Sequence, residues 1–492
     1  MTINNLTDLK SLFFDNKTLK QTIFKNTFWS AVGVGIDRLL RLVLLIYAAR
    51  ILGATEYGKF SFALAFISLF VIFYDFGLPQ IINREFAKEG NKEEEFRSII
   101  SLKILLSFGS FILIVLSSYF ITKDPGIQKI ILILALFDLI NGFITVFHSF
   151  FQALQRMEYR AWIEILLAVL IAITGLFTLF RFPSLENLSY SYLASSLVTL
   201  FFILVFFHFK FFHVKMSWKT AVWRKFLSMS WPLALASLFG IIYNCIDSVM
   251  MGYWGMLTET GWYNAAYRII NVTIIPASLI SRSFFPVLSK FFEESKEKLQ
   301  KAWDNQMEMM ILLAVPLVSG GIVLAPRVIY SFYQSDFAPS ILAFQILIVT
   351  AGVIFLSRPF NDVMISSNQQ KKIFWITIFG AAVNIILNFI LIPKYSLYGA
   401  AVATLITYIL IFPMYFRFTI RHTLISPFQL KFFFTFLLAI MSSALMCFVV
   451  IQPLIYNLNI FISAIFGGLI YLGAFSGLKS ISKKLNLYDF KW

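Results

Sequence analysis

Residues 33–53 of the chain read GVGIDRLLRLVLLIYAARILG. The stretch is long and apolar enough to cross a bilayer, which takes about 20 residues, yet Asp37, Arg38 and Arg41 stand near its middle. A charge at the centre of a membrane helix costs about 2.5–3.5 kcal/mol on insertion scales. Charged residues that persist there are therefore expected to face a protein interior or a watery cavity.

The whole chain has the composition of an integral membrane protein. Of its 492 residues, 59% are hydrophobic and only 13% are charged, whereas soluble domains carry about 25% charged residues. The two cysteines and four histidines show no metal-ligand spacing, so we expect no disulfide, no metal site and no cofactor.

Apolar segments bounded by charged or turn residues predict an all-α fold of about fourteen transmembrane helices. We expect these helices at 27–51, 59–82, 98–121, 127–150, 161–181, 187–209, 226–252, 262–286, 304–330, 338–364, 373–392, 397–418, 430–452 and 457–478.

The predicted helices divide into two sets of six and a final pair. The stretches LGATEYGKFSFA (52–63) and WGMLTETGWYNAA (254–266) occupy corresponding places in the two sets, which favours an internal repeat of the kind found in secondary transporters. We expect a cytoplasmic N-terminal segment (1–26), a first six-helix bundle (27–209), a cytoplasmic linker (210–225), a second six-helix bundle (226–418), an additional helix pair (430–478) and a cytoplasmic tail (479–492).

The basic residues predict the orientation in the membrane. If the N-terminus is cytoplasmic, 28 of the 41 Lys and Arg residues fall on the cytoplasmic side and 7 on the other, as the positive-inside rule requires. Both termini are then cytoplasmic. The same bias, together with attraction to anionic lipid, accounts for the net charge of +16. Nothing in the sequence indicates nucleic-acid binding.

The remaining six basic residues lie inside predicted helices. Lys103 is near the cytoplasmic end of its helix, so we expect its ammonium group to snorkel to the surface. The other five are candidates for a cationic pathway that binds an anionic substrate, above all a phosphate, because guanidinium binds phosphate oxygens bidentately. These five are Arg38, Arg41, Arg268, Arg282 and Arg358. The alternative is that some of them form buried ion pairs, Asp37 with Arg41 and Arg358 with Asp362.

Acidic residues also lie inside the predicted helices, namely Asp37, Asp75, Asp138, Glu164, Asp247 and Asp362. For Asp75, Asp138 and Asp247 two interpretations stay open. They are either partners of the arginines or sites that couple a proton or a cation, and we favour partners.

Four stretches carry a resemblance to a known family: FWSAVGVGIDRLLRLVLLIYAARILGATEYGKFSFALAFISLF (28–70), YDFGLPQIINREFAK (74–88), IDSVMMGYWGMLTETGWYNAAYRIINV (246–272) and NIILNFILIPKYSLYGAAVATLITYIL (384–410). With them the chain resembles the polysaccharide-repeat (O-antigen) flippases, in the polysaccharide transporter branch of the multidrug/oligosaccharidyl-lipid/polysaccharide exporter superfamily.

The resemblance implies two pseudo-symmetric six-helix bundles around a central cavity, with two extra C-terminal helices. It implies a multi-pass protein of the cell membrane that moves an undecaprenyl-diphosphate-linked oligosaccharide from the cytoplasmic to the outer leaflet by alternating access. The implied role is in the biosynthesis of cell-surface polysaccharide such as lipopolysaccharide O-antigen. The implied partners are that lipid-linked oligosaccharide, membrane lipid, and polysaccharide polymerase or assembly proteins. The cavity of such proteins is often cationic, which matches Arg38, Arg41 and Arg268 by motif, and Arg282 and Arg358 by position in their helices.

Three other functions are alternatives to an oligosaccharide flippase. A peptidoglycan-precursor or teichoic-type flippase differs only in the headgroup carried. A multidrug cation antiporter of the sister branch is expected to line its cavity with acids, whereas arginines dominate here. A membrane glycosyltransferase or polymerase needs a large extracytoplasmic loop with catalytic residues, and the widest outer loops, 252–261 and 330–338, are short. We therefore expect a transporter without enzymatic activity.

Overall fold

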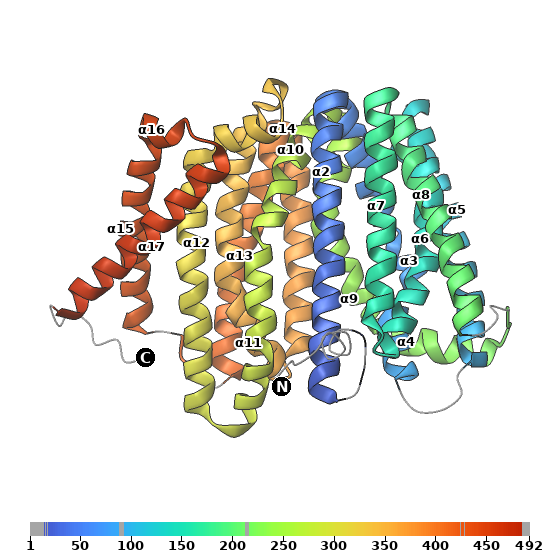
Figure 1. Ribbon diagram of the computed structural model, residues 1–492, viewed down its shortest axis with the longest axis horizontal. Coiled ribbons are helices and arrows are strands. Elements are labelled where there is room, and N and C mark those ends of the chain that lie inside the picture. Colours follow the sequence, from blue (N-terminus) through green and yellow to red (C-terminus); the bar gives the residue numbers. More distant parts are fainter. Residues whose placement is uncertain are drawn as a thin grey trace, which may run out of the picture. The chain divides into compact units, whose positions relative to one another are not determined.

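The computed structural model describes residues 18–87, 93–211, 216–423, 425–427 and 429–484, together with residues 14 and 16. Within these ranges the chain is helical and contains no β-strand (Figure 1). The predicted N-terminal segment lies outside the described residues over 1–13, and the predicted tail does so from residue 485.

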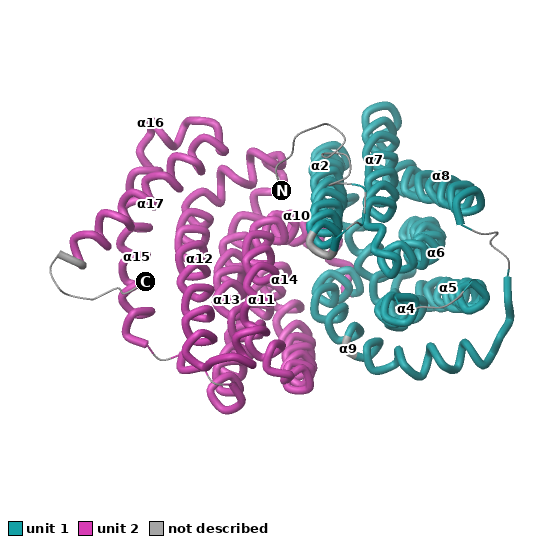
Figure 2. The backbone as a smooth tube through the Cα atoms, turned by 60° about the horizontal axis from the view of Figure 1, so that its bottom comes forward, with its two compact units in different colours: residues 1–253 teal, residues 254–492 magenta. Residues whose placement is uncertain are grey.

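The chain forms two compact units that divide after Tyr253 (Figure 2). The first contains α2 (Leu19–Ser68), α3 (Val71–Asp75), α4 (Leu78–Phe86), α5 (Glu93–Ile121), α6 (Pro125–Ala153), α7 (Met157–Arg181), α8 (Leu185–Lys210) and α9 (Thr220–Tyr253). The second contains α10 (Leu257–Thr273), α11 (Ile275–Glu294), α12 (Lys296–Phe332), the 3₁₀ helix η1 (Ser335–Phe337), α13 (Ser340–Ser366), α14 (Gln370–His422), α15 (Leu430–Ile451), α16 (Pro453–Tyr456) and α17 (Ile460–Lys484).

The described residues hold fourteen membrane spans, the number predicted. Eleven stretches are long and apolar enough to cross a membrane, and α9 is a twelfth whose halves are bent by 44°. Two of the eleven, 21–86 and 370–422, are 66 and 53 residues long, more than twice the length that one span needs. A non-helical residue divides each long helix of these stretches, Gly53 in α2 and Ser396 in α14. We therefore count each stretch as two spans.

In each half of the predicted repeat, a glycine lies in the turn between the first and second predicted helices. Gly53 has φ +77° and Gly255 has φ +76°, a backbone conformation that glycine adopts at little cost and residues with a Cβ avoid. Gly53 lies in LGATEYGKFSFA and Gly255 in WGMLTETGWYNAA. The two stretches thus share a backbone feature as well as a sequence pattern, which supports the internal repeat.

The second span is a broken helix. Helix α3 ends at Asp75, both Phe76 (φ +46°) and Gly77 (φ +68°) are left-handed, and α4 begins at Leu78. Above this break, α2 and α3 are separated at Phe70, whose carbonyl accepts a hydrogen bond of 3.0 Å from Ser110 Oγ of α5. The same carbonyl accepts a hydrogen bond of 3.0 Å from the Phe73 N–H, so the serine adds a second donor at the point where the helix is interrupted, in keeping with the need to satisfy backbone groups inside a membrane.

Each unit has its own aromatic core. In unit 1 phenylalanines of α5, α6 and α8 pack together, with ring centroids 4.4 Å apart for Phe96 and Phe150 and 5.0 Å apart for Phe147 and Phe207. In unit 2 the buried Trp303 of α12 lies 5.3 Å from Phe360 of α13. Aromatic pairs in these geometries add to the gain from burial, and they fix the spans that carry the charged residues.

Ion pairs join the C-terminal helix pair to α12. Lys431 of α15 lies 3.1 Å from Asp304, and Lys479 of α17 lies 3.3 Å from Glu308. Helices α15 and α17 thus belong to unit 2 by charge as well as by apolar packing.

We expect Gly77→Ala to destabilise the protein. A Cβ at this position would lie 2.8 Å from the Ser230 carbonyl oxygen and 2.9 Å from Leu233 Cβ, and the left-handed conformation alone costs a residue with a Cβ about 1–2 kcal/mol. Thermal unfolding of the detergent-purified chain should shift downward by several degrees, on the order that such a loss produces in a domain. Gly240→Ala, in open space on α9, is the control and should not lower the midpoint. Equal midpoints for both variants would contradict the close packing at Gly77.

Candidate functional site

The charged residues of the opening stretch lie on α2. Arg41 Nε donates a hydrogen bond of 2.6 Å to Asp37 Oδ1, so this predicted ion pair is confirmed. Arg38 is exposed and has no ion pair or hydrogen bond with any described residue. Of the two arginines near the middle of the stretch, Arg41 is therefore neutralised by Asp37, and Arg38 is available for another anion.

Helix α7 extends this polar region with residues that the sequence did not single out as a site. Glu164 acts electrostatically on Arg41 and accepts a hydrogen bond of 2.8 Å from Arg160 Nε. His148 Nδ1 of α6 lies 4.0 Å from the Glu164 carboxylate. Arg160 and Glu164 have the i,i+4 spacing that favours ion pairs within a helix. This spacing is the signal in the sequence from which their ion pair could be predicted.

A second polar cluster surrounds the broken span of unit 1. Lys103 Nζ of α5 donates a hydrogen bond of 2.6 Å to Asp75 Oδ1, the last residue of α3. Tyr74 donates its hydroxyl to Asp138 Oδ1 of α6 at 3.2 Å, and the Lys103 ammonium lies 4.9 Å from the centre of the Tyr74 ring. The prediction that Lys103 snorkels was wrong. Its side chain is 1% exposed, because the ion pair with Asp75 satisfies its charge inside the unit.

Unit 2 contains three of the predicted arginines. Arg282 of α11 is exposed, whereas Arg268 of α10 and Arg358 of α13 are half-buried and each has a buried Nε without a hydrogen-bond partner. Among the described residues, no carboxylate forms an ion pair with any of the three. None of the three is thus held by a carboxylate in direct contact within the part of the chain that the structure describes, although Arg358 acts on Asp362 electrostatically.

The predicted ion pair between Arg358 and Asp362 is not formed. Asp362 Oδ2 instead accepts a hydrogen bond of 2.6 Å from Gln306 Nε2 of α12, and both of these side chains are buried. The Gln306 amide, from a neighbouring helix, is thus the hydrogen-bond partner of Asp362, whereas the sequence predicted Arg358, one turn away on the same helix.

Asp247, the last of the predicted acids, is buried on α9. Unit 1 therefore contains Asp37, Arg38, Arg41, Asp75, Asp138 and Asp247, and unit 2 contains Arg268, Arg282, Arg358 and Asp362. Within unit 1 the structure brings Asp37 together with Arg41. It places Asp75 and Asp138 in one cluster with Tyr74 and Lys103. That the arginines of both units serve a single cavity stays a prediction.

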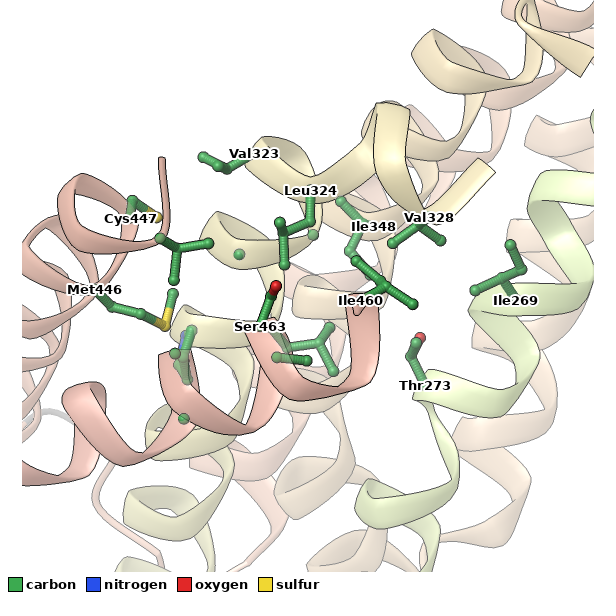
Figure 3. Close-up of a pocket in the computed structure, with 18 of the residues that line it drawn as sticks. Ile269, Thr273, Val323, Leu324, Val328, Ile348, Met446, Cys447, Ile460 and Ser463 are labelled. Carbon is green, nitrogen blue, oxygen red and sulfur yellow. The ribbon is translucent and has the colours of Figure 1, made fainter. Parts of the chain in front are cut away.

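Unit 2 also contains an apolar pocket with a volume of about 430 Å³. Its wall is almost entirely hydrocarbon, from α10, α11, α12, α13, α15 and α17. Of the glycines that line it, Gly468 faces open space. Figure 3 labels ten of its residues, Ile269, Thr273, Val323, Leu324, Val328, Ile348, Met446, Cys447, Ile460 and Ser463. Such a surface suits a hydrocarbon chain and offers little to a polar ligand.

Within unit 2, three arginines without an ion pair among the described residues and an apolar pocket are features that suit an amphipathic anion. Unpaired guanidinium groups inside membrane helices attract phosphate or carboxylate, and the pocket accepts an apolar group. In the described residues there is no group of three or more His, Cys, Asp or Glu that could hold a metal ion.

The sequence matches a model of the family described as polysaccharide biosynthesis protein over residues 23–292. It is 24% identical to the probable low-salt glycan biosynthesis flippase Agl15 of Haloferax volcanii, over 75% of this chain and 77% of that protein. It is 25% identical to a putative O-antigen transporter of Shigella flexneri, over 79% of this chain and 96% of that protein.

Among solved structures, the fold is similar to that of the lipid II flippase MurJ in an inward closed conformation. The TM-score is 0.76 with 18% sequence identity, over 93% of this chain and 99% of that one. At this identity the likeness establishes the fold, an all-helical transporter fold of many spans.

We expect Asp75→Asn to destabilise unit 1 more than the double variant Asp75→Asn, Lys103→Met. The single change leaves the buried Lys103 ammonium without its 2.6 Å partner, and breaking a buried pair in this way costs about 3–5 kcal/mol. The double change removes both charges and should recover part of the loss. Unfolding of the purified chain by a denaturing detergent measures both. If the double variant is less stable than Asp75→Asn, the ion pair with Asp75 does not account for the burial of Lys103.

Proposed function

The chain belongs to the family of polysaccharide biosynthesis proteins, and on this premise we propose that it is a flippase for a lipid-linked oligosaccharide in polysaccharide biosynthesis. The observation that carries the proposal is the set of arginines without a carboxylate partner among the described residues: Arg38 on α2, Arg268 on α10, Arg282 on α11 and Arg358 on α13. Relatives named as a glycan biosynthesis flippase and an O-antigen transporter support it.

The physical problem of such a substrate explains these arginines. A diphosphate–sugar headgroup carries negative charge and many hydroxyl groups, so it cannot enter hydrocarbon without polar partners. Guanidinium groups along the spans replace the water that the phosphates lose, and they stay charged at low dielectric. An arginine held by a carboxylate, such as Arg41, contributes less to this than an unpaired one.

The lipid part of the substrate needs an apolar surface, in contrast to the headgroup. We assign the apolar pocket of unit 2 to a segment of the polyisoprenyl chain, because the walls of the pocket are hydrocarbon from six helices. A diphosphate link of the undecaprenyl type is the chemistry that both surfaces suit. Transport then requires no bond to be made or broken, so we propose a transporter rather than an enzyme.

The proposed cycle is alternating access, from the cytoplasmic to the outer leaflet of the cell membrane. The excess of Lys and Arg at one end of the predicted spans supports cytoplasmic termini by the positive-inside rule. In the native host, deletion of the gene should abolish the surface polysaccharide and trap lipid-linked repeat units in the cytoplasmic leaflet. Normal polysaccharide with no trapped intermediate would contradict the proposal.

We expect Arg38→Gln and Arg358→Gln to slow flipping of a fluorescent polyprenyl-diphosphate oligosaccharide in proteoliposomes. A hydrogen bond to a charged group contributes about 1.5–3 kcal/mol, so the rate at low substrate should fall by about tenfold or more for each variant. Arg181→Gln, an exposed arginine at the end of α7, is the matched control and should retain the rate. Equal rates in all three variants would remove these arginines from the binding role.

Filling the apolar pocket should select against long lipid chains. Gly468 lines the pocket and a Cβ there would meet nothing within 4 Å, so Gly468→Leu is expected to fold and to place a side chain in the pocket space. Flipping of a long-chain substrate should slow several-fold, while a short-chain analogue with the same headgroup is unaffected. Gly473→Leu, on the same helix, outside the pocket and in equally open space, is the control. If Gly468→Leu slows flipping of both substrates equally, the lipid chain does not bind in this pocket.

A further inference from the structure

The cluster at the broken span of unit 1 holds more negative than positive charge. Asp75 and Asp138 are two carboxyl groups, and Lys103 is the one cation beside them in the described residues. Lys103 is already bonded to Asp75, whereas Asp138 accepts its hydrogen bond from the neutral phenol of Tyr74. Asp138 is buried, and an ionised carboxylate in such a place is costly unless a cation compensates it.

Among the described residues, Asp138 forms no ion pair, and its hydrogen bond comes from Tyr74. The groups that act on Asp138 are Tyr74 and Asp75 from α3 and Lys103 from α5. Helices packed on other sides of α6 keep their charges in separate pairs: Asp37 with Arg41 on α2, Arg84 with Glu85 on α4, and Arg160 with Glu164 on α7. Tyr192 of α8 acts on Arg41. Asp247 of α9 and His148 of α6 itself are not among the groups that act on Asp138.

An unpartnered hydroxyl group points into the same cluster. The Ser107 side chain is 1% exposed, and its Oγ has no hydrogen-bond partner in the described part of the chain. Ser107 is one helical turn from Lys103, and Gly142 is one turn from Asp138. The Ser107 oxygen lies over the bare Cα of Gly142, where an added Cβ would be 2.8 Å from it and 3.2 Å from the Tyr74 ring. A buried polar group left unsatisfied costs about 1–3 kcal/mol, so this hydroxyl marks a place for water or a proton donor.

Asp75 connects the cluster to solvent. Its side chain is 31% exposed, whereas Lys103, Tyr74 and Asp138 are buried behind it. Asp75 is also the last residue of α3, directly before the left-handed residues Phe76 and Gly77. A change of charge in the cluster therefore acts on the Lys103–Asp75 bond at the end of α3.

From these observations we propose that Asp138 binds and releases one proton during the transport cycle, with Lys103 and Asp75 as its counter-charges. The inference rests on the proposed function for the cycle and goes beyond it by naming the site of energy coupling. With a proton on Asp138, the carboxyl group is neutral and Lys103 serves Asp75 alone. When the proton leaves to water, the new carboxylate competes for the Lys103 ammonium and weakens its bond to Asp75. The proton is the only species exchanged, and the break at Phe76–Gly77 is the element that responds.

Infrared spectroscopy of the purified full-length protein tests proton binding without transport. The carbonyl stretch of a protonated carboxyl group should appear as the buffer is taken from alkaline to acid, and Asp138→Asn should lack one such band. Asp124→Asn is the matched control, because Asp124 is the exposed N-cap of the same helix and asparagine caps as well as aspartate. Tyr74→Phe should keep the band but titrate it at a different pH, which a purely structural Asp138 would not show. A full set of bands in Asp138→Asn would overturn the proposal.

Proteoliposomes test the coupling. With the membrane potential clamped, exchange of one proton per lipid changes the steady-state ratio of substrate between leaflets about tenfold per unit of pH gradient. Wild type and Asp124→Asn should show this dependence, and Asp138→Asn should show none. A gradient response that survives in Asp138→Asn, or one that follows sodium instead of pH, would overturn the proposal. Failure of the wild type to flip any lipid-linked sugar would overturn the proposed function instead, and the infrared band would still decide proton binding.

Discussion

The cost of an uncompensated charge inside a membrane is the constraint on which the arrangement of polar residues depends. It explains why Lys103 lies against Asp75 and why Arg41 lies against Asp37. By the same constraint, an arginine that no carboxylate contacts among the described residues, such as Arg358, is the kind of residue that the proposed function assigns to an anionic substrate. On that proposal, paired charges belong to the scaffold and arginines without an ion pair belong to the substrate path.

The same constraint governs the backbone. A helix that breaks inside a membrane exposes carbonyl and amide groups that water cannot reach, so a break is stable only where side chains replace the lost hydrogen bonds. At Phe70 the carbonyl accepts hydrogen bonds from both the Phe73 N–H and Ser110 Oγ, and Lys103 binds the carboxylate of the residue that ends α3. Both belong to one face of α5, with Ser107 between them. One helix therefore supports the whole discontinuity of the neighbouring span.

Apolar segments in the sequence predicted the number of spans because the length of a span is set by the membrane and does not depend on tertiary contacts. The Asp37–Arg41 pair was predictable for a similar reason, since its i,i+4 spacing lies within one helix. Partners on other helices were not predictable in this way. The burial of Lys103, the bond from Gln306 to Asp362 and the approach of Glu164 to Arg41 depend on which helices are neighbours, and a single sequence does not contain that information.

The two units solve the same problem with different chemistry. In both, the second span is interrupted, at Phe76–Gly77 in unit 1 and at Ile274 before Pro276 in unit 2. In both, the third and fourth spans place polar side chains in contact: Lys103 and Asp138 meet Tyr74 and Asp75 in unit 1, and Gln306 meets Asp362 in unit 2. Unit 1 combines an ammonium group with two carboxyl groups, an arrangement that a single proton can change. Unit 2 combines a neutral amide with one carboxyl group and leaves its arginines unpaired. An internal repeat that keeps the interruption but varies the charges can therefore assign energy coupling to one unit and anion binding to the other, without altering the fold of either.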